Sequence, residues 1–494
     1  MKNASLLVLA LCFLLLTLVE ALTKKSYLVT TKDNTSLETF HSWIQKLDEG
    51  SGIQIVHEHV DHQSYVTDLT PDEADEVRKK SFIESVFEQG EPHEVRLSRA
   101  IPSSRLDKGF ISSAQPSPKS PLEQRKVEGH GTLNTQMKMM SWNGMGRPPI
   151  TAQYETDQNG GEGVDLHIID TGFNVHLEEL SGRDTKPITY FVPNELSMAE
   201  VPVQARLDAS IEDRTEHGTM TSILAGGKTL GIAPKSHLYL YKYIGNYKNA
   251  DGKIFGKAEL AAYKAVTEKV ISNINKANGR KAVVCMPVRF RTAIPIPAAG
   301  NDALDDVFQS FIDELDNLGV TFVISAGNRG LLGKTTADAY PQRLGTPENN
   351  VITIGGLNYD GTLWVKTTPQ GRLGSITAYN LAKGVTTMRN SGTIIPVDSQ
   401  LAGTSYAAPI TAGMIAVLLG IKKEDRTGVY TGINQIYDES GTHPSATKTK
   451  KYVEGLTFER SFDILQEGTS DPPYELPNEL NAIYNGARGD PILC

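Results

Sequence analysis

Apolar and polar positions after residue 163 alternate between two patterns. Short apolar runs, typical of strands buried on both faces, occupy 164–169, 237–243, 282–288, 320–325 and 351–354. Longer stretches with helical spacing lie between them, at 258–275 and 302–318. One face of the second stretch carries Leu304, Val307, Phe308, Phe311, Ile312 and Leu315. Because strands and helices alternate, the pattern predicts an α/β fold with a mostly parallel central sheet flanked by helices.

Residues 22–98 have the pattern of a small α+β domain. Strand-like runs occur near 26–30, 53–56 and 83–87, and helical spacing covers 37–47. A second helix is predicted after Thr70, because Pro71 and Glu73 complete a helix-start signature. From 99 to 149 Ser, Pro, Lys and Arg accumulate, which is typical of an exposed linker that proteases reach. We expect a maturation cleavage in this linker.

The first 21 residues read as a secretory signal peptide. Lys2 precedes an apolar run over 6–19, and small residues follow. This run is shorter than the roughly 20 residues that span a bilayer. The apolar run 406–421 is also too short and contains Pro409, so we expect a buried helix there. The sequence therefore predicts an extracellular protein, with the vacuole as an alternative, and no membrane partner.

Charge and cysteine content exclude several classes of protein. The net charge of −9 argues against a nucleic-acid partner, which would need a basic face. Residues 22–98 hold 8 basic and 15 acidic side chains, so most of the acidity lies in the predicted N-terminal domain. Three cysteines build no disulfide scaffold, and none is paired as in a zinc site. Cys285 is expected to be a buried thiol, with a bridge to Cys494 as the alternative.

Three segments place an acid, a base and a nucleophile in order along the chain. Asp170 ends the run 164–169, where active groups of parallel sheets gather, although alone it would also fit a turn. His217 and Ser405 each open an apolar helical pattern. A serine hydroxyl needs an imidazole to accept its proton, and the imidazole needs a carboxylate to orient it. Asn328 follows the run 320–325 and could donate its amide to an oxyanion, although Asn after Gly also suits a turn.

These motifs resemble those of the subtilisin-like serine proteases, peptidase family S8, and most closely the proteinase K branch. The resemblance rests on the order Asp170-Thr171-Gly172, His217-Gly218-Thr219 and Gly403-Thr404-Ser405-Tyr406-Ala407-Ala408-Pro409, and it covers about 150–421. It implies a subtilisin-like peptidase domain over 150–494. Asp170 would orient the base, His217 would be the general base and acid, Ser405 the nucleophile, and Asn328 part of the oxyanion hole.

The resemblance also implies a precursor. Residues 24–90 are similar to the inhibitor I9-type propeptide of such proteases, so the chain's own propeptide would be an intramolecular inhibitor. The implied product is a secreted serine endopeptidase that hydrolyses protein or peptide substrates through an acyl-enzyme, and we expect a monomer. No cofactor is required for this chemistry. A structural calcium ion stays open, because its ligands would be scattered loop oxygens.

The predicted substrate-binding strand departs from the family pattern. Relatives usually read Asn-Met-Ser-Leu-Gly-Gly where this chain has Cys285-Met286-Pro287-Val288-Arg289-Phe290, and Glu216 replaces the usual Gly before the catalytic His. We assign substrate binding to Met286, Val288, Arg289, Ser325, Ala326 and Gly327. Because Arg289 replaces a glycine, we hypothesise a bias toward acidic or polar substrate residues.

Other interpretations compete with this one. A catalytically silent subtilisin-fold binding protein would explain the altered strand. A dinucleotide-binding oxidoreductase is excluded, because Gly160–Gly163 precede a strand instead of following it. His130 repeats the His-Gly-Thr motif but precedes Asp170, and Asp165 and His167 lie within a strand. Residues 422–494 show few patterns, and we expect them to wrap the surface of the catalytic domain.

Overall fold

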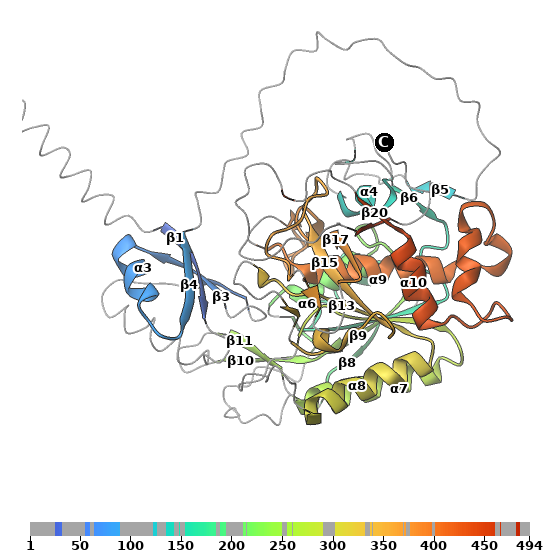
Figure 1. Cartoon of the computed structure of the whole chain (residues 1–494), viewed down its shortest axis with the longest axis horizontal. Coiled ribbons are helices and arrows are strands. Elements are labelled where there is room, and N and C mark those ends of the chain that lie inside the picture. Colours follow the sequence, from blue (N-terminus) through green and yellow to red (C-terminus); the bar gives the residue numbers. More distant parts are fainter. Residues whose placement is uncertain are drawn as a thin grey trace, which may run out of the picture. The chain divides into compact units, whose positions relative to one another are not determined.

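The computed structural model describes two compact units, one formed by Met1–Pro118 with Thr292–Pro295 and one by Lys119–Arg291 with Ile296–Cys494 (Figure 1). The described residues are 25–31, 55–59, 64–88, 122–125, 135–142, 148, 154–183, 188–193, 211–213, 215–248, 254–258, 260–289, 302–330, 336–337, 339–368, 370–371, 376–397, 401–459, 465 and 481–484. The predictions for the signal peptide 1–21, the helix 37–47, His130, Phe290 and Cys494 lie outside the described residues.

The first unit contains an antiparallel sheet of order β2-β3-β1-β4 and one described helix. Its strands are β1 Lys25–Thr31, β2 Ile55–His59, β3 Ser64–Leu69 and β4 Ile83–Glu88. Helix α3, Pro71–Arg78, begins with the predicted capping box: Glu73 N–H donates to Thr70 Oγ1 at 3.3 Å, and Thr70 N–H donates to Glu73 Oε2 at 2.7 Å. The helix start and three of the strands were predicted, whereas β3 was not.

The second unit is built on a nine-stranded sheet of order β20-β21-β17-β15-β13-β12-β7-β9-β8. Every pairing within it is parallel except that of β20 with β21, which confirms the prediction of a mostly parallel sheet. Its strands, in sheet order, are Thr457–Glu459, Asn481–Ile483, Ala378–Leu381, Val351–Leu357, Thr321–Ser325, Lys281–Met286, Val164–Asp170, His237–Lys242 and Thr189–Phe191.

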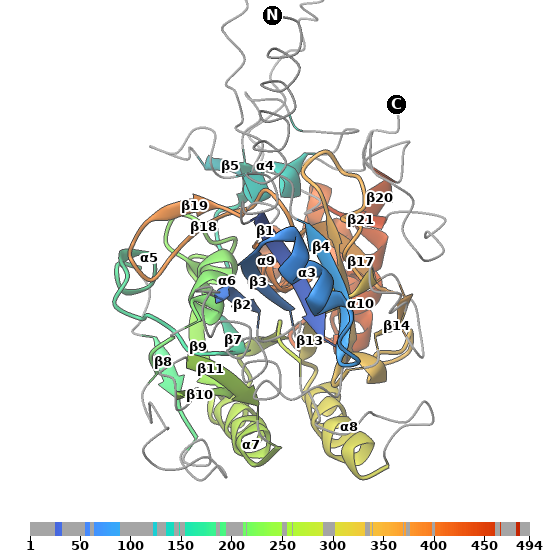
Figure 2. The same cartoon turned by 90° about the vertical axis from the view of Figure 1, so that its left-hand side faces the viewer.

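Helices cover both faces of this sheet (Figure 2). Helices α6 His217–Gly226 and α9 Thr404–Gly420 lie on one face, and α7 Leu260–Lys276 and α8 Asp302–Asn317 lie on the other. Successive strand residues alternate between the two cores. On β12, Val283 and Cys285 pack under α9, whereas Val284 and Met286 pack toward α7 and α8. The unbroken apolar runs in the sequence thus reflect burial on both sides.

Helix α9 is the buried helix that the sequence predicted at 406–421. All residues from Thr404 to Leu419 are buried, and the helix contacts β7, β12, β13, β15 and β17. Within the described part of the chain, no helix combines the length and apolarity needed to cross a membrane. Cys285 is a free thiol, fully buried as predicted, and burial raises its pKa well above the ordinary value.

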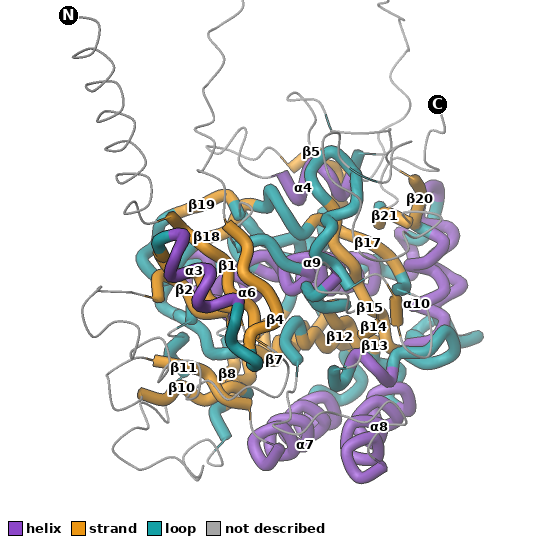
Figure 3. The backbone as a smooth tube through the Cα atoms, turned by 60° about the vertical axis from the view of Figure 1, so that its left-hand side comes forward, coloured by secondary structure: helices purple, strands orange, loops and turns teal. Residues whose placement is uncertain are grey.

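The C-terminal region contributes more to the fold than predicted. Helix α10, Ala446–Gly455, packs beside a 3₁₀ segment at Gly428–Ile436, and β20 and β21 then extend the sheet beyond β17 (Figure 3). Part of this region therefore belongs to the sheet, instead of only wrapping the surface. Strands of three residues are too short to show a periodic pattern, so no sequence pattern predicts them.

Shorter elements complete the second unit. They are β5 Leu122–Arg125, α4 Thr135–Ser141, β6 Tyr154–Asp157, α5 Glu178–Ser181, β10 Ile244–Lys248, β11 Ile254–Ala258, β14 Thr336–Ala337, η4 Gln342–Leu344, β16 Gln370–Gly371, β18 Thr386–Met388, β19 Ile394–Pro396 and η5 Lys423–Asp425. Strands β18 and β19 form an antiparallel hairpin, and β18 packs against α6. This hairpin becomes important at the candidate site.

Candidate active site

The three predicted catalytic residues lie at element ends in the second unit. Asp170 is the last residue of β7, His217 the first of α6, and Ser405 the second of α9. Asp170 is fully buried, the His217 side chain is 16% exposed, and Ser405 is 6% exposed. Both helices are apolar and buried almost throughout, so packing fixes the directions of their first residues.

Asp170 and His217 form a hydrogen-bonded pair. The Nδ1 atom of His217 lies 2.7 Å from Oδ1 of Asp170, which also accepts the N–H of Thr171 at 2.7 Å. The second oxygen, Oδ2, accepts the hydroxyl of Thr221 at 2.7 Å. A carboxylate on Nδ1 selects the tautomer in which Nδ1 donates, so Nε2 is the basic nitrogen of the neutral ring. The pair is thus arranged for proton transfer at Nε2.

Residue 218 must be a glycine because the start of α6 packs directly against the end of β7. A Cβ atom at Gly218 would lie 2.2 Å from the carbonyl oxygen of Gly172 and 3.0 Å from Cβ of Asp170. The first distance is well below any real carbon–oxygen contact, so a side chain there would push α6 away from the end of β7. The glycine after His217 in the motif therefore has a packing reason.

Ser405 and Asn328 face a common space. The Oδ1 atom of Asn328 accepts the N–H and the hydroxyl of Thr404, both at 2.8 Å, which fixes the orientation of the amide. A Cβ atom placed on Gly403 would lie 2.9 Å from Asn328 Nδ2 and 3.1 Å from Ser405 Oγ. The amide nitrogen and the hydroxyl are therefore within 6.0 Å of each other, the sum of these distances. An oxyanion formed at Ser405 would have the amide of Asn328 as a donor.

The start of α9 also lies near the base. The ring centroid of Tyr406, the residue after Ser405, is 6.0 Å from that of His217. The structure thus brings together the four residues that the sequence selected from β7, α6, α9 and the end of β13. Their roles in catalysis remain predictions.

Asp213 is a buried carboxylate that sequence reasoning missed. Its Oδ1 accepts the hydroxyl of Thr171 at 3.0 Å and the N–H of Thr215 at 3.2 Å, and its Oδ2 accepts the N–H and the hydroxyl of Thr219, both at 2.8 Å. Burial raises the pKa of Asp213, and the nearby Asp170 raises it further. Asp213 thereby ties the residue after Asp170 to the first turn of α6. An acid four residues before His217, among threonines, was the available signal.

The predicted substrate-binding residues occupy the ends of the neighbouring strands β12 and β13. The side chains of Met286 and Val288 are buried in the core, so a bound peptide would meet only their backbone. Ser325 Oγ donates to the carbonyl oxygen of Pro287 at 3.0 Å and connects the two strand ends. Arg289 is only partly buried.

The other wall of the predicted substrate site lies at the end of β13. The N–H of Gly327 donates to Thr404 Oγ1 at 3.0 Å, which links this wall to α9. Ala326 is 2% exposed. The assignment of Ser325, Ala326 and Gly327 to substrate binding remains a prediction.

Asp165 and His167 lie inside β7, as the sequence indicated, and have partners of their own. Asp165 is 3.0 Å from Arg280 and 3.5 Å from His237. Nδ1 of His167 is 2.8 Å from the hydroxyl of Tyr241, and complete burial lowers the pKa of His167 to about 3. These residues are part of the structure of the sheet and not of the candidate site.

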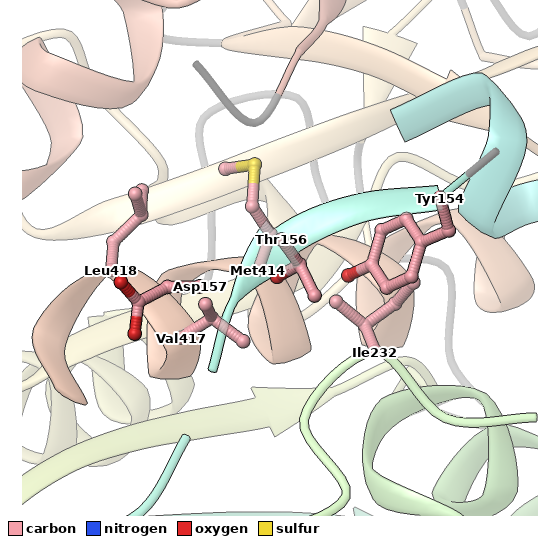
Figure 4. Close-up of a pocket in the computed structure, with 7 residues that line it drawn as sticks. All are labelled: Tyr154, Thr156, Asp157, Ile232, Met414, Val417 and Leu418. Atoms are coloured by element: carbon pink, nitrogen blue, oxygen red, sulfur yellow. The ribbon is translucent and has the colours of Figure 1, made fainter. Parts of the chain in front are cut away.

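A small pocket between β6 and α9 is also separate from the site (Figure 4). Its lining residues are Tyr154, Thr156, Asp157, Ile232, Met414, Val417 and Leu418. Met414 follows Ser405 by nine residues, or about 13 Å along a helix that rises 1.5 Å per residue. In the described ranges, no group of three or more His, Cys, Asp or Glu side chains is arranged to hold a metal ion.

The sequence is similar to those of known proteins. The profile described as the subtilase family matches residues 161–431, more than half of the chain. "Subtilisin-like protease 2" of Trichophyton rubrum is 28% identical over 278 residues, 54% of this chain and 53% of the relative. A subtilisin-like protease of Coccidioides posadasii is 26% identical over 69% of this chain and 73% of its own length.

Solved structures are similar as well. A cold-adapted subtilisin-like serine proteinase shares 18% identity, with a TM-score of 0.47 over 71% of this chain and 98% of that protein. The chain spans about half the length of the curated relatives it matches first. The family match covers the strand with Asp170, the helix with His217 and the helix with Ser405. The chain belongs to the subtilase family.

Proposed function

We propose that the protein is a serine endopeptidase, secreted as a precursor and inhibited by its own N-terminal propeptide. The observation that carries the catalytic part is the arrangement at the sheet edge. The carboxylate of Asp170 is bonded to Nδ1 of His217 at 2.7 Å, and Ser405 shares the space beside Gly403 with the amide of Asn328. The proposal assigns these residues the roles of orienting acid, base, nucleophile and oxyanion donor.

In the proposed reaction, Oγ of Ser405 attacks the carbonyl carbon of the scissile peptide bond while Nε2 of His217 takes the hydroxyl proton. The oxyanion of the tetrahedral intermediate accepts hydrogen bonds from Asn328 Nδ2 and from the N–H of Ser405 at the start of α9. His217 then gives its proton to the departing amine, which leaves an acyl-enzyme. Water, deprotonated by the same imidazole, releases the second product.

Substrate selection is proposed to involve the ends of β12 and β13. Pro287 has no N–H to offer a bound peptide, and its carbonyl already accepts Ser325 Oγ. Arg289 stands where relatives have a small residue, so we propose a preference for acidic or polar residues near the scissile bond. Cleavage profiling on a peptide library tests this. An aliphatic or aromatic preference that Arg289→Ala leaves unchanged would contradict it.

The precursor model rests on the sequence pattern and on the division of the chain into two compact units. Removal of 1–21 would accompany secretion, and cleavage within 99–149 would separate the propeptide domain 22–98 from the peptidase domain 150–494. N-terminal sequencing of the purified extracellular protein tests both cleavages. A mature N-terminus before residue 99 would contradict the proposed propeptide.

Labelling with a serine-directed fluorophosphonate tests the catalytic proposal directly. The wild-type protein should be labelled and should cleave a denatured protein substrate, whereas Ser405→Ala should do neither. Ser440→Ala is the matched control, because Ser440 is an exposed serine in the turn after the 3₁₀ segment Gly428–Ile436. A folded wild-type protein that does not react would instead favour the catalytically silent binding protein.

A further inference from the structure

Glu216, directly before the proposed general base, has an unusual backbone conformation. Its φ of 66° and ψ of −8° lie in the left-handed region, which residues other than glycine rarely adopt. Its carbonyl oxygen accepts the N–H of Met220 at 3.0 Å, the first hydrogen bond of α6. A strained conformation at such a position persists only where the surroundings hold it in place.

The side chain of Glu216 is held by the turn of the β18–β19 hairpin. Its Oε1 accepts the backbone N–H of Asn390 at 3.1 Å, and its Oε2 lies 3.6 Å from a guanidinium nitrogen of Arg389. Both charged side chains are about two-thirds buried, at 28% exposure for Glu216 and 35% for Arg389. The contact is therefore shielded from water more than an ordinary surface ion pair.

The same turn is hydrogen-bonded to the segment after Asp170 and to the segment before His217. The side-chain amide of Asn390 donates to the carbonyl oxygen of Asp213, in the segment before α6. The carbonyl oxygen of Asn390 accepts the amide of Asn174, four residues after Asp170, at 3.1 Å. Asn390 thus connects the loop after β7 with the loop before α6. Glu216, at the start of α6, is bonded to the same residue.

We propose that Glu216 is a positioning residue for His217: its carboxylate fastens the start of α6 to the Arg389–Asn390 turn and so keeps the imidazole in register with Asp170. This inference deepens the proposed function, on which its kinetic part rests. Glu216 touches no reacting atom. It acts by fixing the backbone from which His217 projects. This keeps the hydrogen bond between His217 Nδ1 and Asp170 Oδ1 at 2.7 Å.

Two substitutions separate the effect of the carboxylate from that of the backbone conformation. Glu216→Gly fits the left-handed region without strain but removes the acceptor, so kcat should fall about tenfold while KM and the thermal midpoint change little. Glu216→Gln keeps an acceptor for Asn390 and should retain kcat within about twofold. Because Gln removes a negative charge beside His217, the acid limb of its kcat/KM profile should move to lower pH. Asp170, Asp213 and Arg389, which are charged groups near this position among the described residues, stay unchanged.

The experiment uses the full-length protein, with kcat expressed per serine titrated by the fluorophosphonate. The control is Glu178→Gln, which breaks the exposed pair of Glu178 with Lys228 at 2.7 Å and should match the wild type. A second readout does not depend on activity: in Ser405→Ala protein, the downfield proton resonance of His217 Nδ1–H reports the bond to Asp170. Glu216→Gly should shift or broaden it, whereas Glu216→Gln should not.

The results for Glu216→Gly decide between a positioning role and no role for Glu216. Wild-type kcat and an unmoved resonance in Glu216→Gly would overturn the positioning role. A wild-type protein without peptidase activity would refute the proposed function, and the resonance alone would then decide the role of Glu216. If Glu216→Gly does not fold, Glu216→Asp decides by the same two criteria, because it keeps the charge and tolerates the left-handed region but falls one methylene short of Asn390.

Discussion

Gly403 offers a test of the space in which the reaction is proposed to occur. Its φ of −170° and ψ of 150° are extended backbone that alanine adopts freely, so Gly403→Ala introduces no backbone strain. The added methyl carbon, however, would lie 2.9 Å from Asn328 Nδ2 and 3.1 Å from Ser405 Oγ. The substitution therefore places one carbon atom in close contact with both the proposed oxyanion donor and the proposed nucleophile.

The size of the effect follows from these distances. Non-bonded heavy atoms settle at about 3.5–4.0 Å, so the amide and the hydroxyl would each have to move by about half an ångström. Removal of a single oxyanion donor costs on the order of 10² to 10³ in kcat, and a comparable misplacement costs about a hundredfold. We expect kcat of Gly403→Ala to fall on the order of a hundredfold, with a thermal midpoint close to that of the wild type.

The assay compares peptide hydrolysis and the rate of fluorophosphonate labelling, since the phosphonyl oxygen would occupy the same space as the oxyanion. Gly455→Ala is the matched control, because a Cβ at Gly455, at the end of α10, meets no atom within 4 Å. If Gly403→Ala retained kcat and the labelling rate within twofold, the oxyanion would not form beside Gly403, and the assignment of Asn328 would be refuted.

Two other substitutions test the surroundings of the site, and a third tests the buried interior of the sheet. Asp213→Asn should lower the free energy of unfolding by about 1–3 kcal/mol in denaturant titrations, because an amide cannot accept the N–H groups of Thr215 and Thr219 on two different atoms; unchanged stability would contradict this. Thr221→Val removes the hydroxyl donor to Asp170 Oδ2 and should reduce kcat about tenfold with KM preserved, which steady-state kinetics checks. The pKa of His167 is about 3 in the folded protein and 6.5 in the unfolded chain. Above pH 6.5 the ring is neutral in both states and costs no stability. Below pH 6.5 the unfolded chain binds the proton first, so the free energy of unfolding falls by up to about 5 kcal/mol as the pH approaches 3. In urea titrations at several pH values, the free energy of unfolding of His167→Phe should therefore fall less steeply with decreasing pH than that of the wild type. Equal slopes for the two proteins would contradict the argument.

The sequence predicted the parts of the fold whose patterns are long or fully apolar. Strands β7, β9, β12, β13 and β15 and helices α7, α8 and α9 all coincide with predicted runs. It missed β8, β17, β20 and β21, which have three or four residues each and depend on pairing with neighbours for their existence. The prediction also omits β3, although Tyr65, Val66 and Thr67 favour a strand.

The four site residues could be selected from the sequence because each occurs in a motif at an element end. The supporting residues could not. Thr221 has no special sequence context, and Asp213 has only the weak signal of an acid among threonines. Their hydrogen bonds to Asp170 and Thr171 exist only after α6 has docked on β7. Asn390 lies more than 170 residues from Glu216 in the chain, as the spacing of their hydrogen bond shows, so no local pattern connects them.

The relative position of base and nucleophile depends on a contact between helices, not between loops. His217 and Ser405 each stand at the start of a buried helix, and α6 and α9 pack directly against each other. At that contact, a Cβ atom on Gly413 would lie only 2.6 Å from the carbonyl oxygen of Ala225 and 2.9 Å from Cβ of Ile232. The backbones approach this closely only because residue 413 has no side chain. Any larger residue would separate the helices and move Ser405 relative to His217, although Gly413 lies about 12 Å from Ser405 along α9. The small residues that give α9 its uniformly apolar sequence are therefore part of the reason why two distant motifs meet.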